Sequence, residues 1–351
     1  MPKPWMIYGA NGYSGELIAR EAARRGLKPV LAGRSAAKIQ SLAATLGLET
    51  RVFDLGDAAA TAKGVDGMSL VLHCAGPFSV TAKPMITACL AVRAHYLDIT
   101  GEIAVFEYAQ SLDAAARTAG IVLCPGVGFD VIPTDCLAAT LKAALPDATH
   151  LALGFDSRSG FSPGTAKTAV EGMALGGKVR RDGQIIAVPL AYKTRRIDFG
   201  DGEKLAMTIP WGDVSTAFAT TGIPNIEVYV PGSEAMVTQA RRANWFRWAL
   251  GFSVVQDFIK RRIDKTVKGP SEHKRDAQST YVWGEVTNAR GETRTGRIKT
   301  ANGYSVTVAG ALAVVEHLLR HNGPGGATTP AALIGASLIT TLPGSGPLVV
   351  T

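Results

Sequence analysis

The sequence predicts an α/β fold, in which a doubly wound parallel sheet is followed by a second α+β domain on a mixed sheet. Over residues 1–130, short apolar runs alternate with helical patterns, and after Asp130 strand-like runs joined by hairpin turns replace that alternation. The chain has 351 residues, of which 46% are hydrophobic, so it is long enough for two separate cores. We therefore predict one domain at 1–130 and another at 131–302.

The first domain is predicted to contain six parallel strands separated by helices. Ser14 and Ser35 are placed to cap helices that end at Gly26 and Gly47. Because the strand-like runs are apolar and rich in β-branched residues, we expect a sheet buried on both faces. The predicted strands are 5–9, 29–33, 51–55, 69–75, 96–99 and 121–125.

In the second domain, strand-like runs outnumber helical ones. Residues 288–291, Asn-Ala-Arg-Gly, form a predicted hairpin turn, and helices are expected at about 163–176 and 305–320. The predicted strands are 151–155, 185–192, 204–209, 226–230, 281–287 and 293–300.

Composition narrows the class of protein. The net charge is +8, but the basic residues are scattered and no nucleic-acid-binding motif occurs, so we expect an anionic small-molecule ligand and no nucleic acid. Four cysteines without CxxC pairing are expected to be reduced thiols. The chain shows neither a signal-peptide pattern nor an apolar run long enough to cross a bilayer, so we expect a cytoplasmic protein.

Three glycines at steps of three follow the first strand-like run. Gly9 is expected to allow a tight turn, Gly12 to let a pyrophosphate approach the backbone, and Gly15 to let the helix pack closely on the strand. The N-terminus of the following helix would direct N–H groups toward the phosphates. The alternative is a structural turn that binds no ligand.

The end of the second strand indicates which dinucleotide is bound. An NAD site typically has an acidic residue there, whereas residues 32–38 contain none and instead contain Arg34, Ser35 and Lys38. These three side chains suit the 2′-phosphate of NADP, although solvated residues at a helix start are the alternative. Asp54, after the third strand, is a candidate neighbour of the adenine or a helix cap. Two further loops, 73–78 and 98–102, are expected beneath the cofactor and near its nicotinamide.

Other enzyme classes are disfavoured by specific residues. The Tyr-x-x-x-Lys pair of short-chain dehydrogenases is absent from the sequence. Residues 160–164 match the hydrolase pattern G-x-S-x-G, but Pro163 lacks the N–H that an oxyanion hole needs. His317 and His321 lack the glutamate of a zinc hydrolase, so we expect no metal site.

The motifs YGANGYSGEL, LAGRS, HCAGPF, HYLDITGE and GVGFDVIPTD together resemble those of the saccharopine dehydrogenase-like oxidoreductases, particularly the trans-acting enoyl reductase branch. The resemblance continues to TPAALIGASLITTLPGSG and so covers nearly the whole chain. It implies a Rossmann domain, a substrate domain, and a C-terminal segment, 303–351, that returns to pack near the first domain. It also implies hydride transfer from NADPH to an activated C=C or C=N bond.

The resemblance implies functional residues position by position. Phe129 would lie at the crossing into the substrate domain, and Gly164 and Thr165 would line the substrate cleft. The resemblance supplies no proton donor, and the chain offers Asp130, which could instead cap a helix, and Lys167. The implied cofactor-binding residues are Gly9, Asn11, Gly12, Tyr13, Ser14, Gly15, Arg34, Ser35, Ala75, Gly76 and Pro77.

A helical pattern over 245–263 places aromatic residues at its start and basic residues at its end. It predicts either a peripheral membrane contact or substrate lid, or a helix packed on the core or in a homodimer. For the whole chain we expect an NADPH-dependent reductase of an apolar, acyl-type C=C bond. Reduction of an amino-acid-derived imine, with Arg158, Arg195 and Arg196 binding its carboxylates, and an NADP-binding sensor without turnover remain alternatives.

Overall fold

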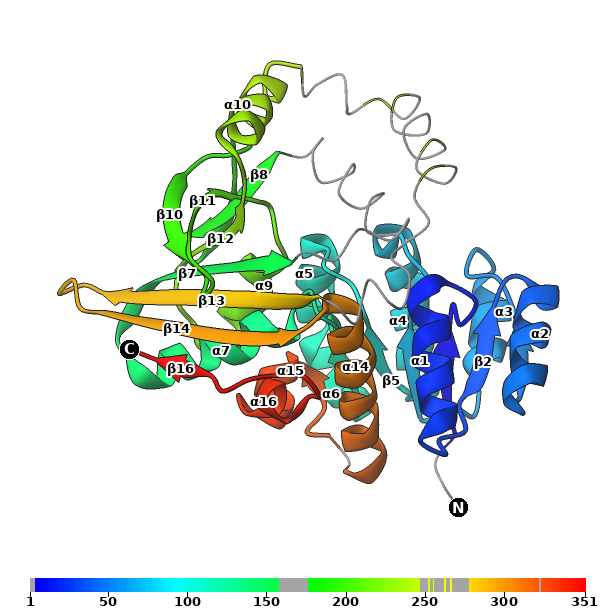
Figure 1. Ribbon diagram of the computed structural model, residues 1–351. Helices are drawn as coiled ribbons and strands as arrows, with labels where there is room; N and C mark the ends of the chain where they lie inside the picture. The colour runs from blue at the N-terminus through cyan, green and yellow to red at the C-terminus, as the bar shows by residue number, and fades with distance from the viewer. Residues whose placement is uncertain are drawn as a thin grey trace. The chain divides into compact units, whose positions relative to one another are not determined.

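The computed structural model describes residues 4–157, 176–246, 278–321 and 323–351, together with positions 252, 255, 262 and 266. The chain divides into two compact units, shown in Figure 1. The first comprises residues up to Ile132 and Tyr304–Gly335, and the second comprises Pro133–Gly303 and Ala336–Thr351. The segment 303–351 is thus divided between the two units.

The first unit is built on a seven-stranded sheet in the order β15-β6-β5-β4-β1-β2-β3, with every pair of neighbours parallel. Six of the strands were predicted, and β15 was not. The order reverses between β1 and β4, which is where a doubly wound sheet binds its ligand. The strands are β1 (Trp5–Tyr8), β2 (Val30–Gly33), β3 (Thr50–Val52), β4 (Leu70–His73), β5 (His95–Asp98), β6 (Val122–Cys124) and β15 (Gly326–Ala327).

Helices cover both faces of this sheet. The pairs α1–α2 and α3–α4 are in contact, and α4 also contacts α5 and α6. Alternate residues of the strands point to opposite faces, so Met6 and Tyr8 join the core beneath α4. The helices are α1 (Tyr13–Arg24), α2 (Ala36–Leu46), α3 (Ala58–Val65), α4 (Phe78–Val92), α5 (Ile103–Ser111), α6 (Asp113–Ala119), α14 (Gly303–Arg320) and α15 (Pro330–Ile334).

Several predicted element ends need correction. Gly12, and not Ser14, occupies the N-cap of α1, so Ser14 lies inside the helix. Ser35 does occupy the N-cap of α2, but its side chain makes no capping hydrogen bond. The third strand ends at Val52 and not at residue 55, because the Asp54 carboxylate accepts a hydrogen bond from Gly56 N and turns the chain.

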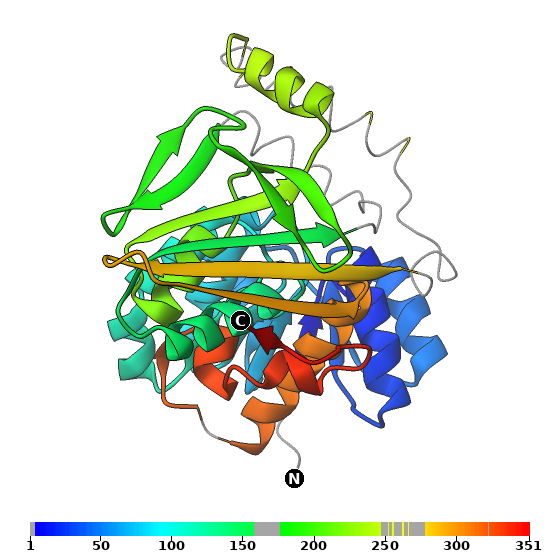
Figure 2. The same cartoon turned by 60° about the vertical axis from the view of Figure 1, so that its left-hand side comes forward.

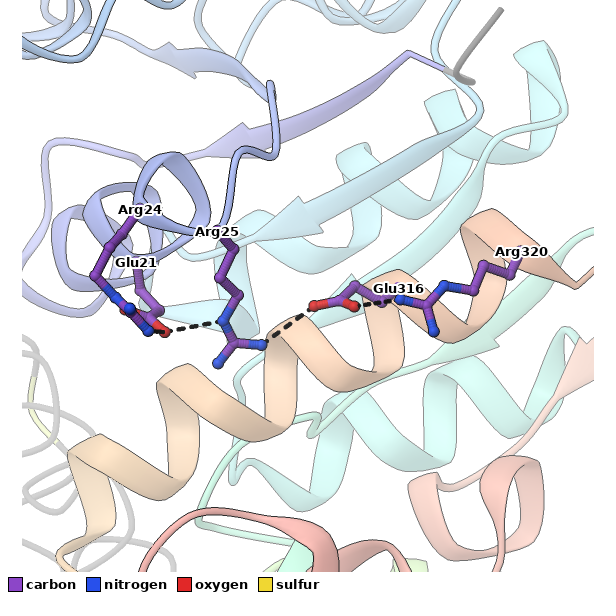
Figure 3. Close-up of polar contacts among 5 residues, drawn as sticks. All are labelled: Glu21, Arg24, Arg25, Glu316 and Arg320. Atoms are coloured by element: carbon purple, nitrogen blue, oxygen red, sulfur yellow. Dashed lines mark hydrogen bonds and ion pairs between the residues drawn. The ribbon is translucent and has the colours of Figure 1, made fainter.

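Helix α14 returns from far along the chain to lie beside α1. The rings of Tyr13 and Tyr304 meet edge to face at 5.0 Å, and the Arg25 guanidinium lies 3.2 Å from the Glu316 carboxylate (Figure 3). Tyr13 and Arg25 are twelve residues apart in α1, and their partners Tyr304 and Glu316 are twelve residues apart in α14. The partners follow one another in the same order, so the two helices run parallel. Their N-termini therefore both lie at the edge that carries the glycine loop.

The second unit contains a mixed sheet, as predicted, but it has nine strands where the sequence predicts six, and β8, β10 and β16 were not predicted. Its main order is β10-β11-β12-β7-β13-β14-β16, with β8 and β9 attached to β12, and only β7 and β12 pair in parallel. Figure 2 shows the long β13–β14 hairpin. The strands are β7 (Ala148–Ser157), β8 (Gly177–Arg181), β9 (Gln184–Val188), β10 (Thr194–Asp198), β11 (Glu203–Thr208), β12 (Asn225–Pro231), β13 (Ser279–Asn288), β14 (Thr293–Ala301) and β16 (Val349–Val350).

The predicted turn at residues 288–291 is the β13–β14 hairpin, in which Gly291 has a φ of +82°. The predicted strand over 185–192 is too long, since Ala191 has a φ of +51° and the chain turns there. The predicted helix at 163–176 lies outside the described residues apart from Gly176. Helices of this unit include α7 (Ile132–Ala144, beginning at the unit boundary), α9 (Asp213–Thr221), α10 (Glu234–Ala243) and α16 (Leu338–Thr341).

All four cysteines are free thiols, as predicted, and three of them are buried. Among the described residues, none of the helices has the length and apolar character needed to cross a bilayer.

Candidate functional site

Two of the three motif glycines are required by contacts within the protein. Gly9 has a φ of +82°, and a Cβ added to it would lie 2.7 Å from the backbone nitrogen of Ala75. A Cβ on Gly15 would lie 2.3 Å from the carbonyl oxygen of Gly9. The β1 loop therefore packs tightly against the β4 loop on one side and against α1 on the other, as the motif predicts.

Gly12 is different, because packing does not explain it. Its φ of −80° is open to any residue, and a Cβ there would meet a single described atom within 4 Å, the Gly9 carbonyl oxygen at 3.2 Å. The missing side chain thus leaves space at the N-cap of α1, where backbone N–H groups lack helical partners. That space and those donors fit a phosphate group.

The structure brings Arg34 and Asp54 together at the ends of β2 and β3. The Arg34 guanidinium lies 4.0 Å from the Asp54 carboxylate, and the two side chains are 76% and 60% exposed. Lys38, in the first turn of α2, is also exposed. Arg34 and Asp54 therefore lie near each other at the carboxyl ends of two neighbouring parallel strands, the edge at which sheets of this kind bind ligands.

Side chains of β4 and α4 form hydrogen bonds that fix the loop after β4. The Thr81 hydroxyl donates to the carbonyl oxygen of Ala75 over 2.7 Å, and His73 Nε2 lies 3.0 Å from the same hydroxyl. Burial lowers the pKa of His73 to about 3, so its imidazole is neutral. Ala75 therefore lies fixed against Gly9 of the glycine loop, and Gly76 and Pro77 follow it in the same loop; their contact with a cofactor stays a prediction.

Asp98, at the end of β5, serves as a structural connection. It is fully buried, and it accepts hydrogen bonds from the Tyr96 hydroxyl at 2.6 Å and from the backbone nitrogens of Thr100 and Gly126 at 2.9 Å. Burial raises its pKa to about 6, against the opposing effect of these donors. Asp98 thereby ties the loop after β5 to the loop after β6.

Glu102 and Asp130 form an acidic pair just beyond these two loops. The Glu102 carboxylate accepts hydrogen bonds from the backbone nitrogens of Phe78 and Ser79, at 2.9 and 2.6 Å, and so caps α4. Asp130 Oδ2 lies 2.8 Å from the position that a Cβ on Gly101 would take. Burial and, secondarily, the charge of Glu102 raise the pKa of Asp130 to about 7. A carboxyl group with that pKa can hold a proton near neutral pH and give it up.

The structure describes Phe129 of the predicted substrate-site residues, but it does not describe the others. The Phe129 backbone nitrogen donates to the Thr307 hydroxyl of α14 over 3.0 Å, near the unit boundary. Gly164, Thr165 and Lys167 lie outside the described residues. The part of the chain that the structure describes contains no group of three or more His, Cys, Asp or Glu side chains suited to a metal ion.

Sequence reasoning did not identify the roles of Glu102 and Thr81. Glu102 contacts Phe78 and Ser79, which lie 24 and 23 residues earlier in the chain, and their approach depends on sheet order. Thr81 contacts Ala75 six residues earlier, within the same strand-to-helix connection, and no motif in the sequence marks that contact. The only sequence signal was that Glu102 follows a predicted strand end.

In the second unit, two of the arginines considered for binding a carboxylate-bearing substrate form ion pairs with glutamates of the protein itself. Arg195 makes hydrogen bonds of 3.0 to 3.2 Å to both carboxylate oxygens of Glu285 and lies 4.8 Å from the ring centre of Trp283. Arg196 lies 3.5 Å from the carboxylate of Glu203. Arg158 is outside the described residues.

Residues 5–124 match the family model described as the saccharopine dehydrogenase NADP binding domain. A saccharopine dehydrogenase-like oxidoreductase of Homo sapiens is 29% identical over 150 residues, which cover 37% of this chain and 35% of that protein. A trans-acting enoyl reductase of Mycobacterium leprae is 33% identical over 140 residues, covering 37% of this chain and 33% of that protein. A trans-acting enoyl reductase of Mycobacterium bovis is 28% identical over 211 residues, which cover 54% of this chain and 49% of that protein.

The matches to these curated relatives thus span between a third and a half of each relative's length. Among solved structures, saccharopine dehydrogenase (L-Glu forming) of Saccharomyces cerevisiae aligns over 99% of both chains with a TM-score of 0.63 and 12% identity. That likeness shows the fold: a parallel Rossmann-type sheet and a second mixed sheet.

Proposed function

Because residues 5–124 match the family model of the saccharopine dehydrogenase NADP binding domain, we propose that this chain is an NADPH-dependent reductase of an activated C=C bond in an apolar, acyl-type substrate. The observation that carries the proposal is the open position at Gly12. Packing within the described residues requires Gly9 and Gly15, whereas the space at Gly12 is what a pyrophosphate needs. The site therefore fits a dinucleotide.

The choice of NADPH over NADH rests on the edge formed by β2 and β3. The β2 end offers the exposed Arg34 and Lys38 with the hydroxyl of Ser35, a donor set that suits a phosphate dianion. Asp54 holds the Arg34 guanidinium at 4.0 Å, which restricts its orientation while leaving most of it exposed. We assign Asp54 to orienting Arg34.

When bound, NADPH supplies a hydride from C4 of its nicotinamide. Asp130 is the proton donor of this proposal, because its pKa, raised to about 7, leaves a substantial fraction of the carboxyl groups protonated at neutral pH. It would protonate the substrate α-carbon while the β-carbon accepts the hydride, and its carboxylate would then regain a proton from solvent. Glu102 opposes the ionised form of Asp130 and so favours that return.

Reduction of an imine is the second candidate function, since relatives at similar identity are named as saccharopine dehydrogenase-like oxidoreductases. It needs cations for the carboxylates of an amino-acid-derived substrate. Arg195 is already paired with both oxygens of Glu285, and Arg196 pairs with Glu203. The engagement of these two arginines favours an apolar acyl substrate.

NADPH oxidation, measured by absorbance with separate panels of enoyl thioesters, enones and imines, tests the proposal. We expect turnover with enoyl thioesters and a lower rate or none with amino-acid-derived imines. Turnover confined to imines would select the second candidate. Tight NADPH binding without turnover on any acceptor would instead support a sensor.

A further inference from the structure

Large exposed apolar side chains are concentrated in one part of the second unit. Among the described residues, Trp245 is 81% exposed, Phe246 66%, Phe252 56% and Met236 50%. The other large hydrophobic side chains with comparable exposure are single valines elsewhere in the chain, at 52, 80 and 349. Two consecutive aromatic side chains exposed to this degree indicate a surface suited to an apolar partner.

Helix α10 holds these two aromatic residues on an ordered backbone. Its inner side is anchored by buried Val237 and by Asn244, whose side-chain oxygen accepts from Leu190 N at 2.8 Å. The backbone nitrogens of Trp245 and Phe246 donate to the carbonyl oxygens of Arg242 and Ala243, each over 3.1 Å. Figures 1 and 2 both show α10 standing clear of the sheet of its own unit.

Basic side chains stand beside the aromatic ones. Arg241 and Arg242, in the last turn of α10, are both exposed and directly precede the turn that carries Trp245 and Phe246. We call these four residues the aromatic–basic patch. Indole and phenyl rings next to arginines match the chemistry of a lipid interface, where rings enter the headgroup layer and cations meet anionic lipids.

We propose that the aromatic–basic patch docks this chain on an anionic membrane surface. The net charge of +8 acts in the same direction. A second copy of the chain is the poorer occupant, because a two-fold interface at the patch would bring both pairs of arginines together. The membrane contact expected at 245–263 lies largely outside the described residues, and the present proposal concerns residues 241–246. This proposal is independent of the reductase proposal.

Vesicle flotation of the full chain tests the docking. Vesicles contain phosphatidylcholine alone, or phosphatidylcholine with about one third phosphatidylserine, and the variants are W245S/F246S, R242E and the matched control V349S. We expect wild type and V349S to float with the anionic vesicles, and W245S/F246S and R242E to bind them about tenfold or more weakly. Neutral vesicles should bind wild type about tenfold more weakly than anionic ones.

Thermal unfolding verifies that each variant is folded, and analytical ultracentrifugation reports its oligomeric state. Wild type that stays unbound with anionic vesicles would overturn the proposal, as would W245S/F246S binding them like wild type. A wild-type dimer that W245S/F246S converts to monomer, without flotation of either, would overturn it in favour of a second copy. Capture of an acidic protein by the patch without any vesicle binding would also overturn it.

Discussion

Alanine substitutions at Gly12 and Gly15 separate a residue required by the ligand from one required by the fold. At Gly15 the new Cβ would lie 2.3 Å from the Gly9 carbonyl oxygen, so backbone must shift. Overpacking of that kind costs about 1–3 kcal/mol, partly offset by about 1 kcal/mol of helix propensity. At Gly12 the single contact is 3.2 Å, and the loss of a good N-cap residue costs about 1 kcal/mol or less.

The assay is thermal unfolding of the protein without cofactor, followed by a fluorescence titration with NADPH. Gly15→Ala should lower Tm by about 2–4 °C for each kcal/mol lost, as expected for a domain of this size. Gly12→Ala should lower Tm by about 2–4 °C at most, while its Kd for NADPH rises at least about tenfold, which corresponds to about 1.4 kcal/mol. A Gly12→Ala protein that binds NADPH as wild type does would refute the assignment of the pyrophosphate to this position.

Four further predictions concern three charged side chains. Arg34→Ala should weaken NADPH binding about tenfold or more with little change for NADH, and equal losses for both cofactors would exclude a contact with the 2′-phosphate. Asp130→Asn should lower the reduction rate by about 10²–10⁴ with NADPH affinity unchanged. The pKa of Asp130 is raised to about 7, so the folded protein loses stability as the pH rises through 7 and this carboxyl group ionises. Asp130→Asn without cofactor should therefore be more stable than wild type at pH 8. A less stable variant would contradict the pKa assignment. Arg24 and Arg25 hold the pKa of Glu21 at about 2, so the stability gap between wild type and Glu21→Gln should be present above pH 4.5 and close as the pH falls toward 2, measured by urea unfolding.

The first unit could be predicted well because its signals are local. Each buried strand is a short apolar run, and helix ends are marked by glycines such as Gly47, which adopts φ +65° at the C-cap of α2. The glycine spacing likewise predicted the turn at Gly9 and the close helix packing at Gly15, whereas the phosphate position stays a prediction. The two-residue strand β15 could not be predicted from local sequence, because it forms by pairing with β6, which lies far away in the chain.

The polar contacts of the candidate site were less predictable for the same reason. Glu102 reaches the start of α4 only because β4 and β5 are neighbours in the sheet. The raised pKa of Asp130 depends on burial and on Glu102, neither of which the sequence displays. The sequence suggested Arg195 as a partner for a substrate carboxylate, but its guanidinium donates hydrogen bonds to Glu285, 90 residues away in the chain.

Transfer of isotope from NADPH that carries deuterium at both C4 positions tests the central claim most directly. The protein is incubated with the labelled cofactor and a trans-2-enoyl thioester, and the product is examined by mass spectrometry. We predict a saturated thioester that carries one deuterium at its β-carbon, formed by wild type and much more slowly by Asp130→Asn. Saturated product without deuterium at that carbon, or no label in any product of the enoyl, enone and imine panels, would contradict the account.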